Sequence, residues 1–204
     1  MTNFSYGARL NSFKLGLKDD EHKEQHLTIR LLKRAVEAGL TQMDLNYPDH
    51  FQGLNINELT HFISKQPINI NGLAMRYYTA PEFKLGAFTH PDPRIRRLAL
   101  DETKRGLDMA SELGCSLMTL WMGQDGFDYS FQGEFAEMWD NTILAIQEVA
   151  DYDKTINISI EYKPNEPRAF SLMPDVSTTL LALKEVDRAN TGVTLDFAHI
   201  LYAD

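Results

Sequence analysis

Apolar positions along the chain recur with two periods, one typical of helices and one typical of strands. Runs in which apolar side chains recur every three or four residues predict amphipathic helices. Short runs rich in branched and small apolar residues predict strands. The predicted helices span residues 22–38, 57–65, 94–113, 135–152 and 175–189. The predicted strands span residues 4–10, 40–46, 68–77, 116–122, 156–163 and 191–197.

The regular alternation of these strands and helices predicts an α/β fold with a parallel sheet and helices outside it. Segments that follow the strands are long and polar, whereas those that follow the helices are short, often a single glycine such as Gly39 or Gly114. A (β/α)8 TIM barrel has this asymmetry, because its site lies in the loops at the carboxyl ends of the strands. Since such a barrel has eight strands and about 250 residues, we expect residues 1–204 to be a single partial barrel domain, truncated after strand six, with strands seven and eight missing.

The composition of the chain argues against some classes of binding partner. The chain has 204 residues, 43% of them hydrophobic, and a net charge of −9. Nucleic acids and anionic membranes select for basic surfaces, so this surplus of carboxylates argues against both. The single cysteine, Cys115, cannot form an internal disulfide and is interpreted as packing, and no apolar run approaches the roughly 18 residues of a membrane span. We expect a cytoplasmic protein that acts on a small molecule.

Polar side chains replace apolar ones at the ends of the fifth and sixth predicted strands. In the fifth strand, the period of two places Glu161 and Lys163 on one face, toward the mouth of the barrel. The sixth strand brings Asp196, and His199 follows three residues later. Two carboxylates and an imidazole suit a divalent cation such as Mg²⁺ or Mn²⁺. Such a cation would also let both carboxylates stay ionised at close range.

Each pair also has an ordinary explanation. A Glu and a Lys two positions apart on a strand form salt bridges in many proteins, and Asp-x-x-His arises often by chance. Their position favours a functional site. Both pairs lie on adjacent strands, where an apolar strand turns polar, and in the loops that form the active site of a TIM barrel.

The residues at these strand ends resemble a known family. Residues 160–168, Ile-Glu-Tyr-Lys-Pro-Asn-Glu-Pro-Arg, look like the metal-site strand of xylose isomerases, and the Glu-Tyr-Lys variant resembles bacterial L-rhamnose isomerases. Residues 196–199, Asp-Phe-Ala-His, are similar to the next metal-site strand. Residues 88–91, 94–97 and 120–129 agree as well, so that the resemblance to the xylose isomerase-like TIM-barrel superfamily runs from about residue 86 to the end.

The resemblance implies a divalent-metal centre. Glu161 and Asp196 would be carboxylate ligands, with Asp196 bridging two ions, and His199 would bind the second ion. The metal would be Mn²⁺, Mg²⁺ or Co²⁺, with Zn²⁺ also possible. The family's remaining ligands come from strands seven and eight, so the chain would hold half of a two-metal site.

The resemblance also implies a sugar pocket. Lys163 would contact the carbonyl oxygen of the substrate, and Trp121 and Phe88 would line its apolar side. We place Glu166 at the rim as a further substrate contact. In the loop after the second strand, we propose His50 as an acid–base group because its unperturbed pKa suits that work; a solvated loop histidine is the alternative.

The expected function is that of a metal-dependent sugar isomerase of carbohydrate metabolism, which interconverts an aldose and a ketose by hydride shift. A sugar or keto-acid epimerase or isomerase that works by proton transfer is the alternative within the same superfamily, although Lys163 favours hydride shift over a carboxylate base. An abasic-site endonuclease is disfavoured by the −9 charge and only 6 histidines. A non-catalytic binding module is a further alternative. Because an open barrel exposes strand edges, we expect a partner or further chain to cover them, and the protein to be a homo-oligomer.

Overall fold

The central sheet is parallel throughout. The computed structural model describes residues 6–17 and 25–203. Its main sheet has six strands in the order β1-β2-β3-β4-β6-β8, and every neighbouring pair is parallel. These strands are β1 (Gly7–Arg9), β2 (Gln42–Tyr47), β3 (Asn69–Met75), β4 (Leu117–Trp121), β6 (Asn157–Glu161) and β8 (Thr191–Thr194). The predicted α/β class with a parallel sheet is confirmed.

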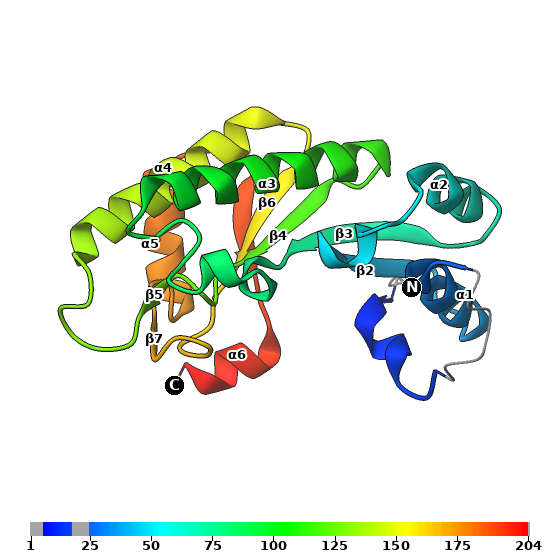
Figure 1. Cartoon of the computed structure of the whole chain (residues 1–204), viewed down its shortest axis with the longest axis horizontal. Helices are drawn as coiled ribbons and strands as arrows, with labels where there is room; N and C mark the ends of the chain where they lie inside the picture. Colours follow the sequence, from blue (N-terminus) through cyan, green and yellow to red (C-terminus); the bar gives the residue numbers. More distant parts are fainter. Residues whose placement is uncertain (1–5, 18–24, 204) are drawn as a thin grey trace, which may run out of the picture.

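Helices connect the strands on the outside of the sheet (Figure 1). The connecting helices are α1 (Leu27–Glu37), α2 (Ile56–Ser64), α3 (Pro93–Glu112), α4 (Phe135–Tyr152) and α5 (Val176–Val186). A further helix, α6 (Phe197–Tyr202), follows β8. Short 3-10 turns η1 (Leu10–Lys14), η2 (Asp49–Phe51), η3 (Tyr77–Thr79) and η4 (Pro81–Phe83) lie after β1, β2 and β3. None of the helices in the described ranges is long and apolar enough to cross a membrane.

The structure corrects several predicted bounds and adds one ribbon; the helix predicted over 175–189, for example, ends at Val186. The strand predicted over 191–197 ends at Thr194, and a helix, α6, starts at Phe197. The strand predicted over 156–163 ends at Glu161. A two-stranded antiparallel ribbon, β5 (Gly126–Phe127) with β7 (Phe170–Ser171), was not predicted. The predicted starts at residues 4–5 and 22–24 lie outside the described residues.

The strands in the middle of the sheet are buried on both faces, as is usual for parallel sheets. In β6, Ile158, Ile160 and also the polar Ser159 between them are buried. Helix α3 packs so closely over the sheet that a Cβ on its Gly106 would lie 3.0 Å from Met118 Cε. The same Cβ would lie 3.1 Å from Met75 Sδ, so α3 packs directly on β3 and β4.

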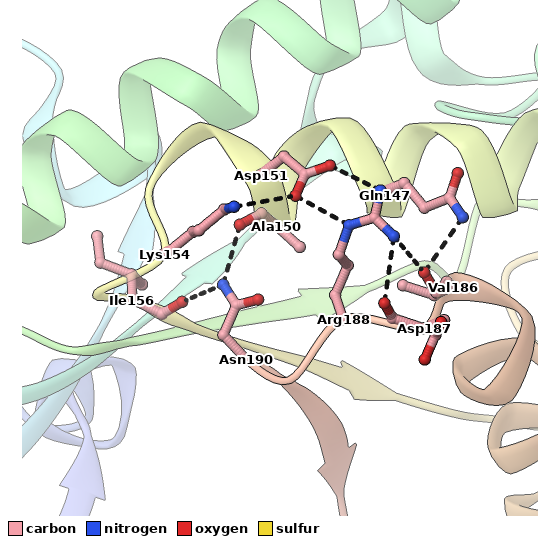
Figure 2. A network of polar contacts seen from close by, with 9 residues as sticks. All are labelled: Gln147, Ala150, Asp151, Lys154, Ile156, Val186, Asp187, Arg188 and Asn190. Atoms are coloured by element: carbon pink, nitrogen blue, oxygen red, sulfur yellow. Dashed lines mark hydrogen bonds and ion pairs between the residues drawn. The ribbon is translucent and has the colours of Figure 1, made fainter.

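A polar network holds the start of β8 against α4 and α5 (Figure 2). Arg188 donates to both carboxylate oxygens of Asp151 in α4, at 2.9 and 2.8 Å. The same guanidinium donates to the carbonyl oxygens of Val186 and Asp187, each at 3.1 Å, at the end of α5. The carboxyl end of α5 is therefore tied to the last turn of α4.

Asn190 completes this network. Its side-chain amide donates to the carbonyl oxygens of Ala150 and Ile156, each at 3.0 Å. The carbonyl of Ala150 lies in the last turn of α4, where carbonyls lack partners within the helix. Asn190 thus joins α4, the segment before β6 and the segment before β8 at the amino end of the sheet.

Candidate functional site

Three predicted metal ligands come together at the carboxyl ends of β6 and β8. Glu161, Asp196 and His199 each offer one ligand atom, and these atoms all lie within 4.8 Å of one another. His199 Nδ1 is 3.6 Å from Glu161 Oε1, and His199 Nε2 is 3.9 Å from Asp196 Oδ2. Both distances are too long for hydrogen bonds. The Nδ1–Oε1 distance suits two ligands of one ion, because two atoms about 2.1 Å from a cation lie about 3 to 4 Å apart. An imidazole binds an ion through one nitrogen, so the contact at Nε2 shows only that Asp196 lies beside the ring.

The imidazole of His199 is positioned by a helix cap. Asp196 is the N-cap residue of α6, and its Oδ1 accepts the backbone N–H groups of Ala198 at 2.8 Å and His199 at 3.2 Å. Its Oδ2 faces His199. His199 Nδ1 is buried and has no hydrogen-bond partner in the described part of the chain. A buried nitrogen without a partner is costly, and a metal ion on this nitrogen would satisfy it.

Glu161 is a buried carboxylate whose two oxygens have different neighbours. Its side chain is 3% exposed, Oε1 faces His199, and Oε2 lies 2.8 Å from Nη2 of Arg9. Arg9 ends β1, which is not a neighbour of β6 in the sheet. The ion pair therefore bridges the inside of a curved sheet, as in a barrel. A buried charge needs such a partner, because desolvation of a lone carboxylate is expensive.

Three of the predicted substrate residues lie beside this group. Lys163 and Glu161 line the same small cavity, and the Lys163 side chain is 14% exposed. Its Nζ lies 2.8 Å from Glu166 Oε2 and 5.9 Å from the centre of the Trp121 ring. The hydrogen bond from Lys163 holds the pKa of the exposed Glu166 below its usual range. Trp121 Nε1 is buried and has no hydrogen-bond partner among the described residues.

His50 lies apart from the metal group and is occupied by other contacts. The residue is 5% exposed, so the alternative of a solvated loop histidine is wrong. Nδ1 accepts the backbone N–H of Asn46 at 2.9 Å, and Nε2 lies 2.8 Å from Asn11 Oδ1. Because Nδ1 is an acceptor, Nε2 carries the proton of the neutral ring. Burial lowers the pKa of His50 to about 4, with smaller effects from nearby cations. Its acid–base role stays a prediction, and that role requires one of these hydrogen bonds to break.

Phe88 belongs to the hydrophobic core. It is 0% exposed, and its ring packs against that of Tyr77 at 5.6 Å between centroids. A sugar would touch Phe88 only after its neighbours moved. The predicted contact with the substrate stays a prediction.

Two arginines at the strand ends were not predicted as site residues from the sequence. Arg9 ends β1, and Arg76 follows β3, where its guanidinium lies 4.3 Å from the centre of the Tyr78 ring. Burial lowers the pKa of Arg76; the charge of Arg9 adds to this effect, whereas Asp49 and Glu161 oppose it. Both arginines stand where an apolar strand turns polar, which is the signal that identified Glu161. Arg76 also lines a cavity of about 530 Å³ between the segments after β2 and β3 and helix α3.

Comparison with known proteins places the chain in a family. A family model described as xylose isomerase-like TIM barrel matches residues 32–204. The chain is 32% identical over 145 residues to xylose isomerase of Thermus thermophilus, which covers 66% of this chain and 38% of that protein. The chain therefore spans little more than a third of that relative.

Solved structures agree on the fold. An AP endonuclease, family 2, of Brucella melitensis superposes with a TM-score of 0.75 at 16% identity, over 98% of this chain and 71% of that one. A D-allulose 3-epimerase of Methylomonas sp. in complex with D-allulose gives 0.75 at 20% identity, over 98% and 65%. An IOLI protein with a binding zinc atom gives 0.66 at 14% identity, over 86% and 59%. With the family match over most of its length, this chain belongs to the xylose isomerase-like TIM-barrel family.

Proposed function

We propose that this protein is a divalent-metal-dependent sugar isomerase that interconverts an aldose and a ketose by hydride shift. The observation that carries the proposal is the convergence of Glu161, Asp196 and His199, with a buried imidazole nitrogen that lacks a partner among the described residues. Two carboxylates and an imidazole suit Mn²⁺, Mg²⁺ or Co²⁺, and Zn²⁺ also accepts them. The relative named xylose isomerase supports this class of reaction.

The side chains around the group have separate tasks in this proposal. A bound divalent ion would polarise the oxygens of the open-chain sugar. Lys163 donates a hydrogen bond to the carbonyl oxygen and stabilises the negative charge that develops there. Glu166 holds the ammonium of Lys163 at the rim, and Trp121 offers an apolar face and an N–H group that no described residue engages. A hydride shift needs no protein base at the reacting carbons, which agrees with an ammonium at this position.

Charge-removing substitutions of the ligands test the proposal. Glu161→Gln and Asp196→Asn should abolish Mn²⁺ binding and the metal-dependent conversion of aldoses to ketoses. Asn is also a good N-cap residue, so Asp196→Asn should leave α6 in place. The matched control is Glu137→Gln, the same change at an exposed position of α4. Undiminished metal-dependent activity in both ligand variants would refute the proposal.

A sugar epimerase or isomerase that works by proton transfer is the second candidate. The structure offers a carboxylate for the base, because Glu166 lies beside Lys163 at the rim, and structures named as D-allulose, D-psicose and L-ribulose 3-epimerases share the fold. Reaction in D₂O separates the two mechanisms. Deuterium from solvent in the product indicates proton transfer, whereas a hydride shift leaves the product unlabelled. Binding to abasic DNA in a gel shift would instead favour a nuclease.

The proposal also covers the location, the substrate and the assembly of the protein. We expect a cytoplasmic enzyme with a small sugar substrate, and we expect strands seven and eight to lie outside this single partial barrel domain. In the described part of the chain, β1 and β8 each pair on one side only. Unpaired edges favour a covering chain, which strands seven and eight or a second copy would supply, and the homo-oligomer stays a prediction. Sedimentation of the native protein measures this directly.

A further inference from the structure

Arg9 has no task in the proposed reaction, yet it touches the most buried candidate ligand. Its Nη2 donates to Glu161 Oε2 at 2.8 Å, across 152 residues of sequence. This is the only hydrogen bond of the Arg9 guanidinium among residues 6–17 and 25–203. The Arg9 side chain is 46% exposed, whereas that of Glu161 is 3% exposed. The cation therefore reaches from solvent to a buried anion at the centre of the site.

The ion pair limits what Glu161 can offer to a metal. With Oε2 held by Arg9, only Oε1 faces His199 and the centre of the candidate group. Glu161 can then bind an ion through one oxygen. Mn²⁺, Mg²⁺ and Zn²⁺ accept a carboxylate in this way, whereas Ca²⁺ seeks six to eight oxygens and often takes both oxygens of a carboxylate.

The charge of Arg9 also opposes the charge of a metal ion. A divalent ion on Oε1 would share one carboxylate with the guanidinium, so the two cations would lie within several ångströms of each other. At such a distance, like charges near a protein surface repel each other appreciably. The site without metal is correspondingly stabilised, because the buried carboxylate of Glu161 already has a counter-charge.

We propose that Arg9 is a resident counter-cation of the metal centre, which weakens metal binding and restricts Glu161 to coordination through a single oxygen. This proposal rests on the proposed function, because it assumes that the group of Glu161, Asp196 and His199 binds a divalent ion. In it, Arg9 is a positioning residue that acts on the metal through Glu161. Its consequence is a centre that exchanges its ion readily and discriminates against Ca²⁺.

Metal titration of chelator-treated protein tests the proposal by isothermal calorimetry with MnCl₂ and CaCl₂. Arg9→Gln keeps a donor for Oε2 and removes the charge, so its Kd for Mn²⁺ should fall at least about tenfold. Arg9→Met removes the charge and the donor, so its affinity for Ca²⁺ should rise more than its affinity for Mn²⁺. Arg9→Lys keeps the charge and should stay within about threefold of the wild type.

Arg94→Gln is the matched control, because Arg94 forms an exposed ion pair with Asp92 at the start of α3. Its Mn²⁺ affinity should equal that of the wild type. Circular dichroism establishes that each variant is folded, and Arg9→Met serves if Arg9→Gln does not fold. Unchanged or weaker Mn²⁺ binding in the folded neutral variants would overturn this inference and leave the isomerase intact. A wild type that binds no Mn²⁺ would overturn both.

Discussion

The stability of the protein should depend on pH through His50. This side chain is buried and neutral, and its two ring nitrogens bond to the backbone N–H of Asn46 and to Asn11 Oδ1. Protonation would put a hydrogen on Nδ1, directed at a backbone N–H group, and would create a charge in a buried place. His50→Asn keeps an acceptor near the position of Nδ1 but has no group that ionises, so it isolates the effect of protonation.

The direction and the size of this pH dependence follow from the pKa of His50 in the unfolded and in the folded protein. The pKa of His50 falls from 6.5, the ordinary value of a solvated histidine, to about 4 in the folded protein. Between these values the unfolded chain binds more protons than the folded one, so stability is present above pH 6.5 and is lost as the pH falls through 4. Each pH unit of difference corresponds to about 1.4 kcal/mol. The free energy of unfolding should therefore fall by roughly 3 kcal/mol between pH 7 and pH 4 because of His50 alone.

Urea unfolding at several pH values, followed by circular dichroism, measures this dependence. The wild type should lose about 3 kcal/mol more than His50→Asn over the same interval, although the variant is the less stable protein at pH 7. His61→Asn is the control, because His61 is exposed on α2, and it should follow the wild type. Parallel curves for the wild type and His50→Asn would refute the assignment of a buried neutral imidazole.

The remaining predictions concern the network at the amino end of the sheet and the metal centre. Asn190→Ala removes the donors to two carbonyls, so it should cost about 2 kcal/mol and lower Tm by roughly 4 to 8 °C. Asn57→Ala, at an exposed position of α2, should leave Tm nearly unchanged in the same thermal scan. Mn²⁺ at a hundred times its Kd should stabilise the wild type by about 2.7 kcal/mol, and Glu161→Gln should abolish this rise in Tm. A rise of equal size in Glu161→Gln would place the ion elsewhere.

Long periodic segments are the part of the fold that the sequence predicts well. The helix predicted over 135–152 coincides with α4. An apolar face that continues over five turns defines clearly where such a helix begins and ends. The ribbon of β5 and β7 escaped prediction, since each of its strands has only two residues and carries no period. The pairing of Arg9 with Glu161 escaped it for a different reason. Contacts across a barrel depend on how the sheet curves. The order of apolar and polar residues within one strand does not indicate that curvature.

The candidate metal group shows how predicted residues can converge although the predicted element is wrong. On a continuous strand, Asp196 and His199 would point to opposite faces, because side chains three positions apart alternate. The chain instead leaves strand geometry at Thr194, and Asp196 caps α6. His199 is three residues after the N-cap residue Asp196, and in the first turn of a helix these two side chains lie on the same side. The carboxylate and the imidazole can therefore face the same point. The spacing that suggested a metal site is thus also a helix-start signal, and the change from strand to helix allows both side chains to converge on Glu161.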